Sequence, residues 1–163
     1  MAKSAQKIPI NIAVQLAQKA DINLILAFCR ALNEEDPSFT GEITFDEASV
    51  RGALEELLAN PSLGRAWLVF GDNSPIGYTV LTFGFSLESH GRDGILDEIY
   101  ISPTYRGQGI GSRVVEFVEA EARRLGLKKL YLEVERNNQQ ARALYQKLGF
   151  QDFNRYLLNK RLD

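Results

Sequence analysis

Hydrophobic residues recur along the chain with two different periods, and these periods predict its strands and helices. Alternation of apolar and polar positions, as at Ile10, Ile12 and Val14, is typical of a half-buried strand. This pattern predicts strands over residues 8–14, 66–70, 76–85, 96–101, 129–135 and 150–158. Apolar residues three and four positions apart predict helices over residues 22–32, 47–60, 110–125 and 139–148.

Capping and turn residues set the expected limits of these elements. Asp21 is expected to cap the first helix, and residues 44–47 read as a capping box that opens the second. Residues 71–75 have strong turn chemistry, and Gly84 indicates a bulge or a close approach inside a strand. Residues 87–94 are expected to form a polar loop before the central strand.

The order of elements predicts an α/β fold with a mixed sheet flanked by helices. Antiparallel hairpins come first, and a βαβ unit supplies a parallel pair in the second half. Such a pair opens at the end where ligands bind. We find no repeat, low-complexity tract or linker, so residues 1–163 are expected to form one domain.

A glycine-rich stretch joins the central strand to the helix that follows it. Gly107, Gly109 and Gly111 have no Cβ and let a ligand approach the backbone. The free N–H groups and dipole of a helix N-terminus suit a phosphate or diphosphate, and Arg106 adds a positive charge. The third glycine comes one position too early for a dinucleotide fingerprint, and Ser112 follows without the lysine of a Walker loop.

The composition of the chain limits the kinds of binding partner and the cellular compartment that we expect. The 163 residues are 45% hydrophobic and 25% charged, with a net charge of −2, which gives no general attraction to nucleic acid or an anionic membrane. No apolar run approaches the roughly 20 residues that span a bilayer. The lone Cys29 favours a reducing cytoplasm, and a single histidine, His90, excludes a multi-histidine metal site.

Two motifs resemble those of one enzyme superfamily. The sequence Arg-Gly-Gln-Gly-Ile-Gly at 106–111 is similar to the acyl-CoA loop of the GNAT N-acetyltransferases. Residues 138–150 resemble that superfamily's later motif, Asn-x-x-Ala-x-x-Leu-Tyr-x-x-x-Gly-Phe. The matched region runs from about Leu96 to Phe150. A looser resemblance, through the acidic patch within residues 33–37 and through Leu96-Asp97-Glu98, is to the spermidine/spermine-type acetyltransferases.

The resemblance implies acetyl-CoA as the donor, a primary amine as the acceptor and no metal. The diphosphate would lie on backbone amides of the glycine loop, and the pantetheine arm would pair with a strand edge. The implied cofactor-binding residues are Ile99, Ile101, Arg106, Gly107, Gln108, Gly109, Ile110, Gly111, Ser112, Asn138 and Tyr145.

Three residues are the candidates for proton transfer. An amine with a pKa near 10 is mostly protonated at neutral pH, so exposing its lone pair costs about 4 kcal/mol. Asp97 or Glu98 could accept this proton, and strand alternation places them on opposite faces, so only one would reach the acceptor. By resemblance, Tyr145 would donate a proton or hydrogen bond to the departing thiolate.

Several alternatives follow from the sequence. The acceptor is expected to be a small amine or polyamine, while a protein N-terminus or lysine is the second possibility. An alternative from another class of protein is a regulatory module that binds CoA without catalysing a reaction. The resemblance also implies a homodimer, formed through the last strand at 150–158.

Overall fold

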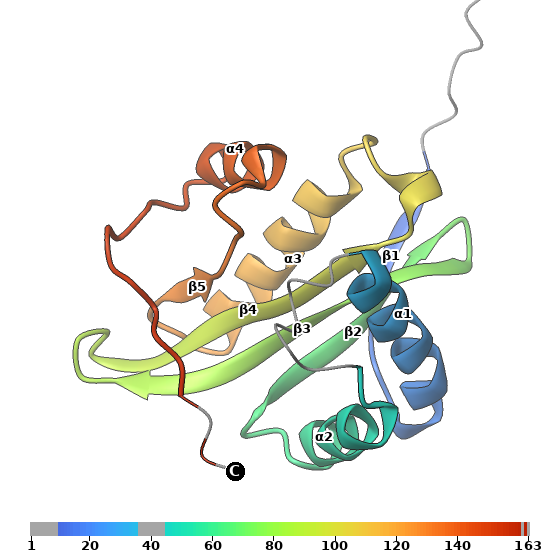
Figure 1. Cartoon of the computed structure of the whole chain (residues 1–163), viewed down its shortest axis with the longest axis horizontal. Helices are drawn as coiled ribbons and strands as arrows, with labels where there is room; N and C mark the ends of the chain where they lie inside the picture. Colours follow the sequence, from blue (N-terminus) through green and yellow to red (C-terminus); the bar gives the residue numbers. More distant parts are fainter. Residues whose placement is uncertain (1–9, 36–44, 161, 163) are drawn as a thin grey trace, which may run out of the picture. The chain divides into compact units, whose positions relative to one another are not determined.

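The computed structural model describes residues 10–35, 45–160 and 162. The chain divides into two compact units, Met1–Glu133 and Val134–Asp163, and each is described by itself. The described part of the first unit holds a five-stranded sheet in the order β1-β2-β3-β4-β5 (Figure 1).

The described elements of the first unit follow the predicted order. The strands are β1 (Ile12–Leu16), β2 (Gly64–Gly71), β3 (Ser74–Ser86), β4 (Gly91–Ile101) and β5 (Leu130–Leu132). The helices are α1 (Ile22–Glu35), α2 (Glu47–Ala59) and α3 (Ile110–Arg124), with short 3₁₀ turns η1 (Lys19–Asp21) and η3 (Pro103–Tyr105). Strands β1 to β4 pair antiparallel and β4 pairs parallel with β5, so the mixed sheet is confirmed.

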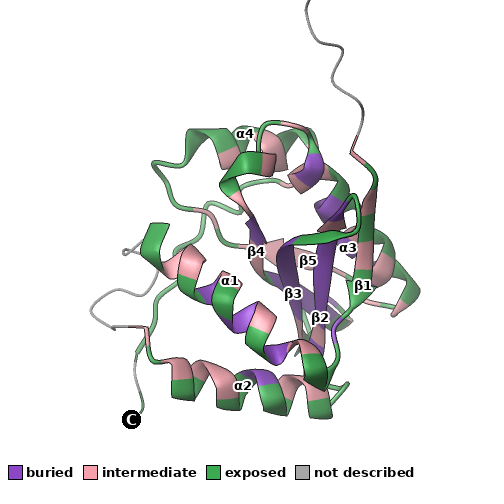
Figure 2. Ribbon diagram, turned by 90° about the vertical axis from the view of Figure 1, so that its right-hand side faces the viewer, coloured by how far each residue is buried: buried purple, intermediate pink, exposed green. Residues whose placement is uncertain are grey.

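Helices cover the two faces of this sheet. One core cluster joins α1 and α2 to β2, β3 and β4, with Ile25, Tyr78 and Tyr100 among its buried members. The other joins α3 to the opposite face, where Val69 and Val114 have no exposed surface. Figure 2 shows the buried residues of the strands between these helical layers.

The hairpin between β3 and β4 corrects the expected loop at 87–94. The turn covers only residues 87–90, and Gly91–Gly94 already pair with β3. Gly84 lies opposite Asp93, and a Cβ at Gly84 would stand 2.5 Å from the Asp93 Oδ1 atom. The prediction of a close approach at Gly84 is therefore confirmed, and that of a bulge there is wrong.

The bulge in this hairpin lies at Asp97. On β3, Val80 pairs with Glu98 and the next residue, Leu81, pairs with Leu96, so Asp97 is an additional residue of β4. Such a residue breaks the alternation of side chains along a strand. The premise that placed Asp97 and Glu98 on opposite faces is therefore wrong, because the strand is not regular between them.

The caps of the first two helices differ from those predicted. Asp21 ends the η1 turn, where its carboxylate accepts the N–H of Gln18 at 2.8 Å. Helix α2 is capped by Asp46, which accepts the N–H of Ala48 at 3.1 Å, while Thr44 lies outside the described residues. Glu47 does not close a capping box there, because it begins α2 and its carboxylate pairs with arginine side chains.

The edge strands are also shorter than predicted. β1 begins at Ile12, and residues 8 and 9 of its predicted range lie outside the described residues. β5 covers Leu130–Leu132 rather than 129–135, and it pairs only with Gly94–Leu96 of β4. The bulge at Asp97 follows directly, which explains why the parallel ladder stops there.

The second unit contains α4 (Gln139–Lys147) and an extended tail. Asn138 caps α4 as predicted, because its side chain accepts the N–H of Ala141 at 3.0 Å. The predicted strand at 150–158 is not formed. The N–H of Asn154 bonds to Asp152 Oδ1 at 2.8 Å, and Asn154 has a φ of 50°, so a local turn replaces extended backbone.

Candidate active site

The glycine loop connects the end of β4 to α3 with a left-handed backbone. Gly107 and Gly109 have φ values of 71° and 76°, which side chains other than glycine rarely adopt. Gly109 is the N-cap of α3, and a Cβ at either glycine would meet no atom within 4 Å. The loop therefore leaves space beside its own backbone for a ligand.

The N–H groups of this loop remain available. The first backbone bond of α3 runs from the N–H of Arg113 to the carbonyl of Gly109, at 3.2 Å. Within the described ranges, we find no protein acceptor for the backbone N–H groups of residues 107–112. Free amides at a helix N-terminus form a site for an anion such as a diphosphate.

The guanidinium of Arg106 makes its contacts within the protein. Its Nε donates to the carbonyl of Ile101 at 2.7 Å, and its Nη2 lies 2.6 Å from Glu35 Oε2. The guanidinium also lies over the ring of Tyr100, 5.4 Å from the centroid. Arg106 stands at the predicted place beside the loop, but a carboxylate offsets its charge.

The edge of β4 is open beyond the short parallel ladder. β5 pairs only as far as Leu96, so Ile99 and Ile101 have no partner on β5. These are the residues whose backbone is predicted to pair with the pantetheine arm. The Ile101 carbonyl already accepts the Arg106 bond, although a carbonyl oxygen can accept a second one.

Glu98 lies on the face of the sheet that α1 covers. The hydroxyl of Tyr78 donates to Glu98 Oε2 at 2.9 Å. Burial raises the pKa of Glu98, and this hydrogen bond opposes the rise. Burial, followed by the nearby charge of Glu98, raises the pKa of Cys29 to about 12, so its thiol is inert. Asp97 is solvent-exposed, and partial desolvation raises the pKa of its carboxyl.

Aromatic side chains pack around Tyr78, the hydrogen-bond partner of this carboxylate, and no pattern in the sequence pointed to them. Phe28 of α1 stacks on Tyr78, with centroids 6.2 Å apart, and lies 5.7 Å from the ring of Tyr100. Asn33 follows Cys29 by one helical turn, and its Oδ1 atom is buried with no hydrogen-bond partner in the part of the chain described. The helical spacing of Phe28 and Asn33 was visible in the sequence, but the stacking of Phe28 on Tyr78, which in turn binds Glu98, depends on how α1 packs on the sheet.

The second unit supplies the remaining candidates. Tyr145 is half-buried on α4, and its ring packs edge-on against Phe150 with centroids 5.9 Å apart. Burial raises the pKa of Tyr145, so the phenol stays protonated over a wider pH range. The roles predicted for Tyr145 and for Asn138 stay predictions.

An open parallel strand pair, free amides at a helix N-terminus and a desolvated carboxylate together fit an acyl-CoA-dependent transferase, the class that the sequence resemblance implies. The described residues contain no group of three or more side chains that could hold a metal ion. They also contain no helix with the length and apolar character needed to cross a membrane.

Comparison with known proteins gives the family. The model of the Acetyltransferase (GNAT) family matches residues 25–150, and the chain belongs to this family. It is 30% identical over 152 residues to the thialysine N-epsilon-acetyltransferase of Bos taurus, covering 86% of this chain and 85% of that protein. The chain is accordingly an acetyl-CoA-dependent N-acetyltransferase, and the alternative of a module without turnover is dropped.

Solved structures agree with this assignment. An integron cassette protein from the Cole Harbour Salt Marsh metagenome superposes with a TM-score of 0.80 at 28% identity, covering 92% of this chain and 90% of its own. A predicted acetyltransferase from Clostridium acetobutylicum, solved with acetyl-CoA, superposes with a TM-score of 0.76 at 25% identity, covering 92% of this chain and 96% of its own.

Proposed function

We propose that the chain transfers the acetyl group of acetyl-CoA to the primary amine of a small molecule by direct attack on the thioester. The observation that carries the proposal is the Glu98 carboxylate, held by Tyr78 among aromatic side chains on the face beneath α1. A carboxylate next to aromatic rings suits a cationic amine. The similarity to the thialysine N-epsilon-acetyltransferase supports an amino acid or polyamine as acceptor.

Glu98 is suited to accept the proton that the amine must lose. A proton moves from an ammonium to a carboxylate more easily when the pKa of the carboxylate is raised. Burial changes the pKa of Glu98 in this direction. The unpaired Oδ1 atom of Asn33 provides a further acceptor on the same side of the sheet. Asp97 lies at the bulge and is the second candidate for the base.

The proposed donor site uses the free amides of residues 107–112 for the diphosphate. The backbone of Ile99 and Ile101 would hold the pantetheine arm as an added strand. A backbone N–H at this edge would polarise the thioester carbonyl. Tyr145 would then donate to the departing thiolate.

A panel of acceptors tests this function. Release of free thiol from acetyl-CoA is measured with polyamines, amino acids including thialysine, and a lysine peptide as acceptors. We expect turnover with the small amines to exceed turnover with the peptide. Preference for the peptide, or for a protein N-terminus, would replace this acceptor class with the second one.

Two variants separate the candidate bases. We expect Glu98→Gln to remove the acid limb of the pH profile of kcat/KM, and Asp97→Asn to retain it. The reverse result would give the role to Asp97.

We further propose a cytoplasmic homodimer. The resemblance to polyamine acetyltransferases supports the dimer, and the exposed Tyr156, Leu157 and Leu158 provide apolar surface in the second unit. The buried thiol of Cys29 fits a reducing compartment. Light scattering after size-exclusion chromatography tests the dimer, and a monomer at micromolar concentration would contradict it. Cell fractionation tests the compartment.

A further inference from the structure

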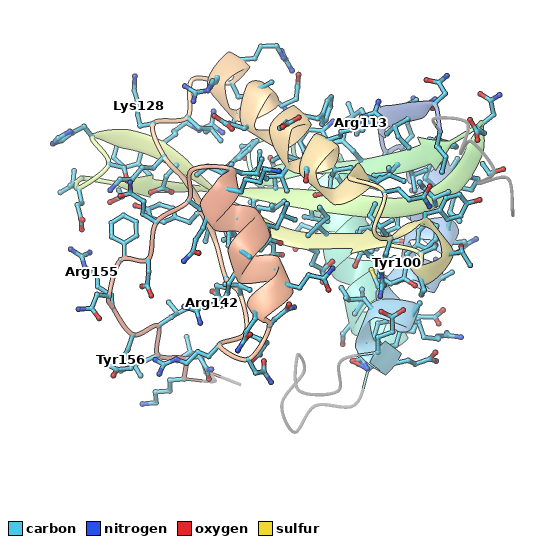
Figure 3. All side chains as sticks on the ribbon, turned by 90° about the horizontal axis from the view of Figure 1, so that it is seen from above. Tyr100, Arg113, Lys128, Arg142, Arg155 and Tyr156 are labelled. Atoms are coloured by element: carbon cyan, nitrogen blue, oxygen red, sulfur yellow. The ribbon has the colours of Figure 1, made fainter. Side chains whose placement is uncertain are left out.

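The end of α1 is joined to the start of the glycine loop by four residues, which we call the Arg106 bridge. Its members are Glu35, Tyr100, Ile101 and Arg106. The hydroxyl of Tyr100 donates to Glu35 Oε1 at 3.3 Å, so both oxygens of this carboxylate are engaged. Figure 3 labels Tyr100, the aromatic member of the bridge.

The bridge fixes the backbone at the point where the loop begins. Arg106 directly precedes Gly107, the first residue of the loop with a left-handed backbone. Its guanidinium bonds to the last carbonyl of β4 and to α1 at the same time, as a planar fork with several donors can do. The direction in which the amides of residues 107–112 leave β4 therefore depends on Glu35.

We propose that Glu35 and Arg106 are positioning residues, which set the glycine loop for acetyl-CoA rather than supply charge to its phosphates. The inference rests on the proposed donor site at residues 107–112. It differs from the role predicted from the sequence, in which the Arg106 charge attracts the diphosphate. It also assigns a function to Glu35, which the sequence showed only as part of an acidic run.

The two possible roles of Arg106 predict opposite changes in acetyl-CoA affinity for one variant, Glu35→Gln. Glu35→Gln removes the carboxylate that offsets the Arg106 charge. If that charge attracts the phosphates, the variant binds acetyl-CoA more tightly. If the bridge positions the loop, the variant binds acetyl-CoA more weakly. The side chains of Arg106 and Glu35 are partly exposed, at 45% and 35%, which limits the strength of their ion pair. We therefore expect the dissociation constant of acetyl-CoA to rise only about fivefold in Glu35→Gln.

Calorimetric titration with acetyl-CoA measures this change. Glu34→Gln is the matched control, because it removes the same charge one residue earlier, and the described residues give it no hydrogen bond or ion pair. We expect its affinity to equal that of the wild type. We expect kcat of Glu35→Gln at saturating acetyl-CoA to stay near that of the wild type, so the loss appears in KM.

Arg106→Lys provides the second arm, since lysine keeps the charge and loses the planar fork. We expect Arg106→Lys to weaken acetyl-CoA binding about as much as Glu35→Gln does. We expect the double variant to bind acetyl-CoA no more weakly than either single variant. Additive losses, or unchanged or tighter binding in Glu35→Gln, would overturn the inference and leave the donor site intact. If the wild type and Gly109→Asp bind acetyl-CoA equally well, the proposed donor site at residues 107–112 is contradicted, and so is the inference that rests on it.

Discussion

Tyr78 has no exposed surface, yet its hydroxyl donates to a carboxylate that we place next to the reacting amine. Through this contact the buried Tyr78 affects the pKa of the Glu98 carboxyl. The bond stabilises the ionised form of Glu98 and so lowers its pKa, while burial raises it. The balance sets the pH at which Glu98 can accept a proton.

Tyr78→Phe removes only the hydroxyl of this pair. Without the hydrogen bond the pKa of Glu98 rises further, so a larger fraction of the carboxyl is protonated at a given pH. We expect the acid limb of the kcat/KM profile to move to higher pH. A partly buried acceptor also loses its partner, which lowers the free energy of unfolding by about 1 kcal/mol. An acid limb at the wild-type pH would contradict control by Tyr78.

Tyr145→Phe tests the second proton site. The raised pKa of Tyr145 keeps the phenol protonated at neutral pH, as a donor to a thiolate requires. We expect kcat to fall about a hundredfold, while calorimetry shows unchanged acetyl-CoA affinity. Tyr156→Phe, which alters an exposed tyrosine of the same unit, is the control. Unchanged turnover of Tyr145→Phe would remove this residue from the mechanism.

Among the elements, the junction of β4, the glycine loop and α3 has the most direct connection to binding. Its chemistry is that of the backbone, because the donors are N–H groups and the glycines supply conformations that side chains would strain. Substitutions there should therefore act through charge and shape at the ligand.

Gly109→Asp and Gly109→Asn form a matched pair at this junction. Both residues tolerate a left-handed backbone better than most and have nearly the same size. Only the aspartate places a negative charge beside the diphosphate. We expect Gly109→Asp to abolish acetyl-CoA binding in calorimetry and Gly109→Asn to retain a measurable part. Equal affinities would show that the diphosphate lies elsewhere.

The sequence predicted this junction well because its signals are local. Glycine spacing, a strand and an amphipathic helix specify it within residues 96–125, and the cap at Asn138 is equally local. The bulge at Asp97 has no such signal, since it depends on register against β3. The contacts of Glu35 and Tyr78 depend on packing between distant segments, and the turn at Asn154 overrode the apolar pattern of 150–158.

Over the whole molecule, the sheet of the first unit separates two tasks. The side under α1 and α2 holds Glu98 and its aromatic neighbours, and the end that leads into α3 presents free amides. Both meet at β4, so occupation of the donor site should stabilise the sheet as well as the loop.

A thermal melt in acetyl-CoA measures this stabilisation. A ligand at one hundred times its dissociation constant adds about 2.7 kcal/mol to the free energy of unfolding. For a chain of 163 residues we expect the melting temperature to rise by roughly 5–10 °C. Gly109→Asp should melt at the same temperature with and without acetyl-CoA. An equal rise in both proteins would indicate binding outside the glycine loop.

The additional residue in β4 has a consequence for how this active site can vary. Exchanging the side chain of Asp97 leaves the backbone count unchanged, so Leu96 and Glu98 keep their pairing with β3. Removing Asp97 would make Leu96 and Glu98 direct neighbours on opposite faces, as in a regular strand, and would leave their pairing with Leu81 and Val80 unchanged. At Asp97 the strand can therefore lose a residue without turning its other side chains over, whereas a deletion inside the regular part of the ladder would reverse the faces on one side of it.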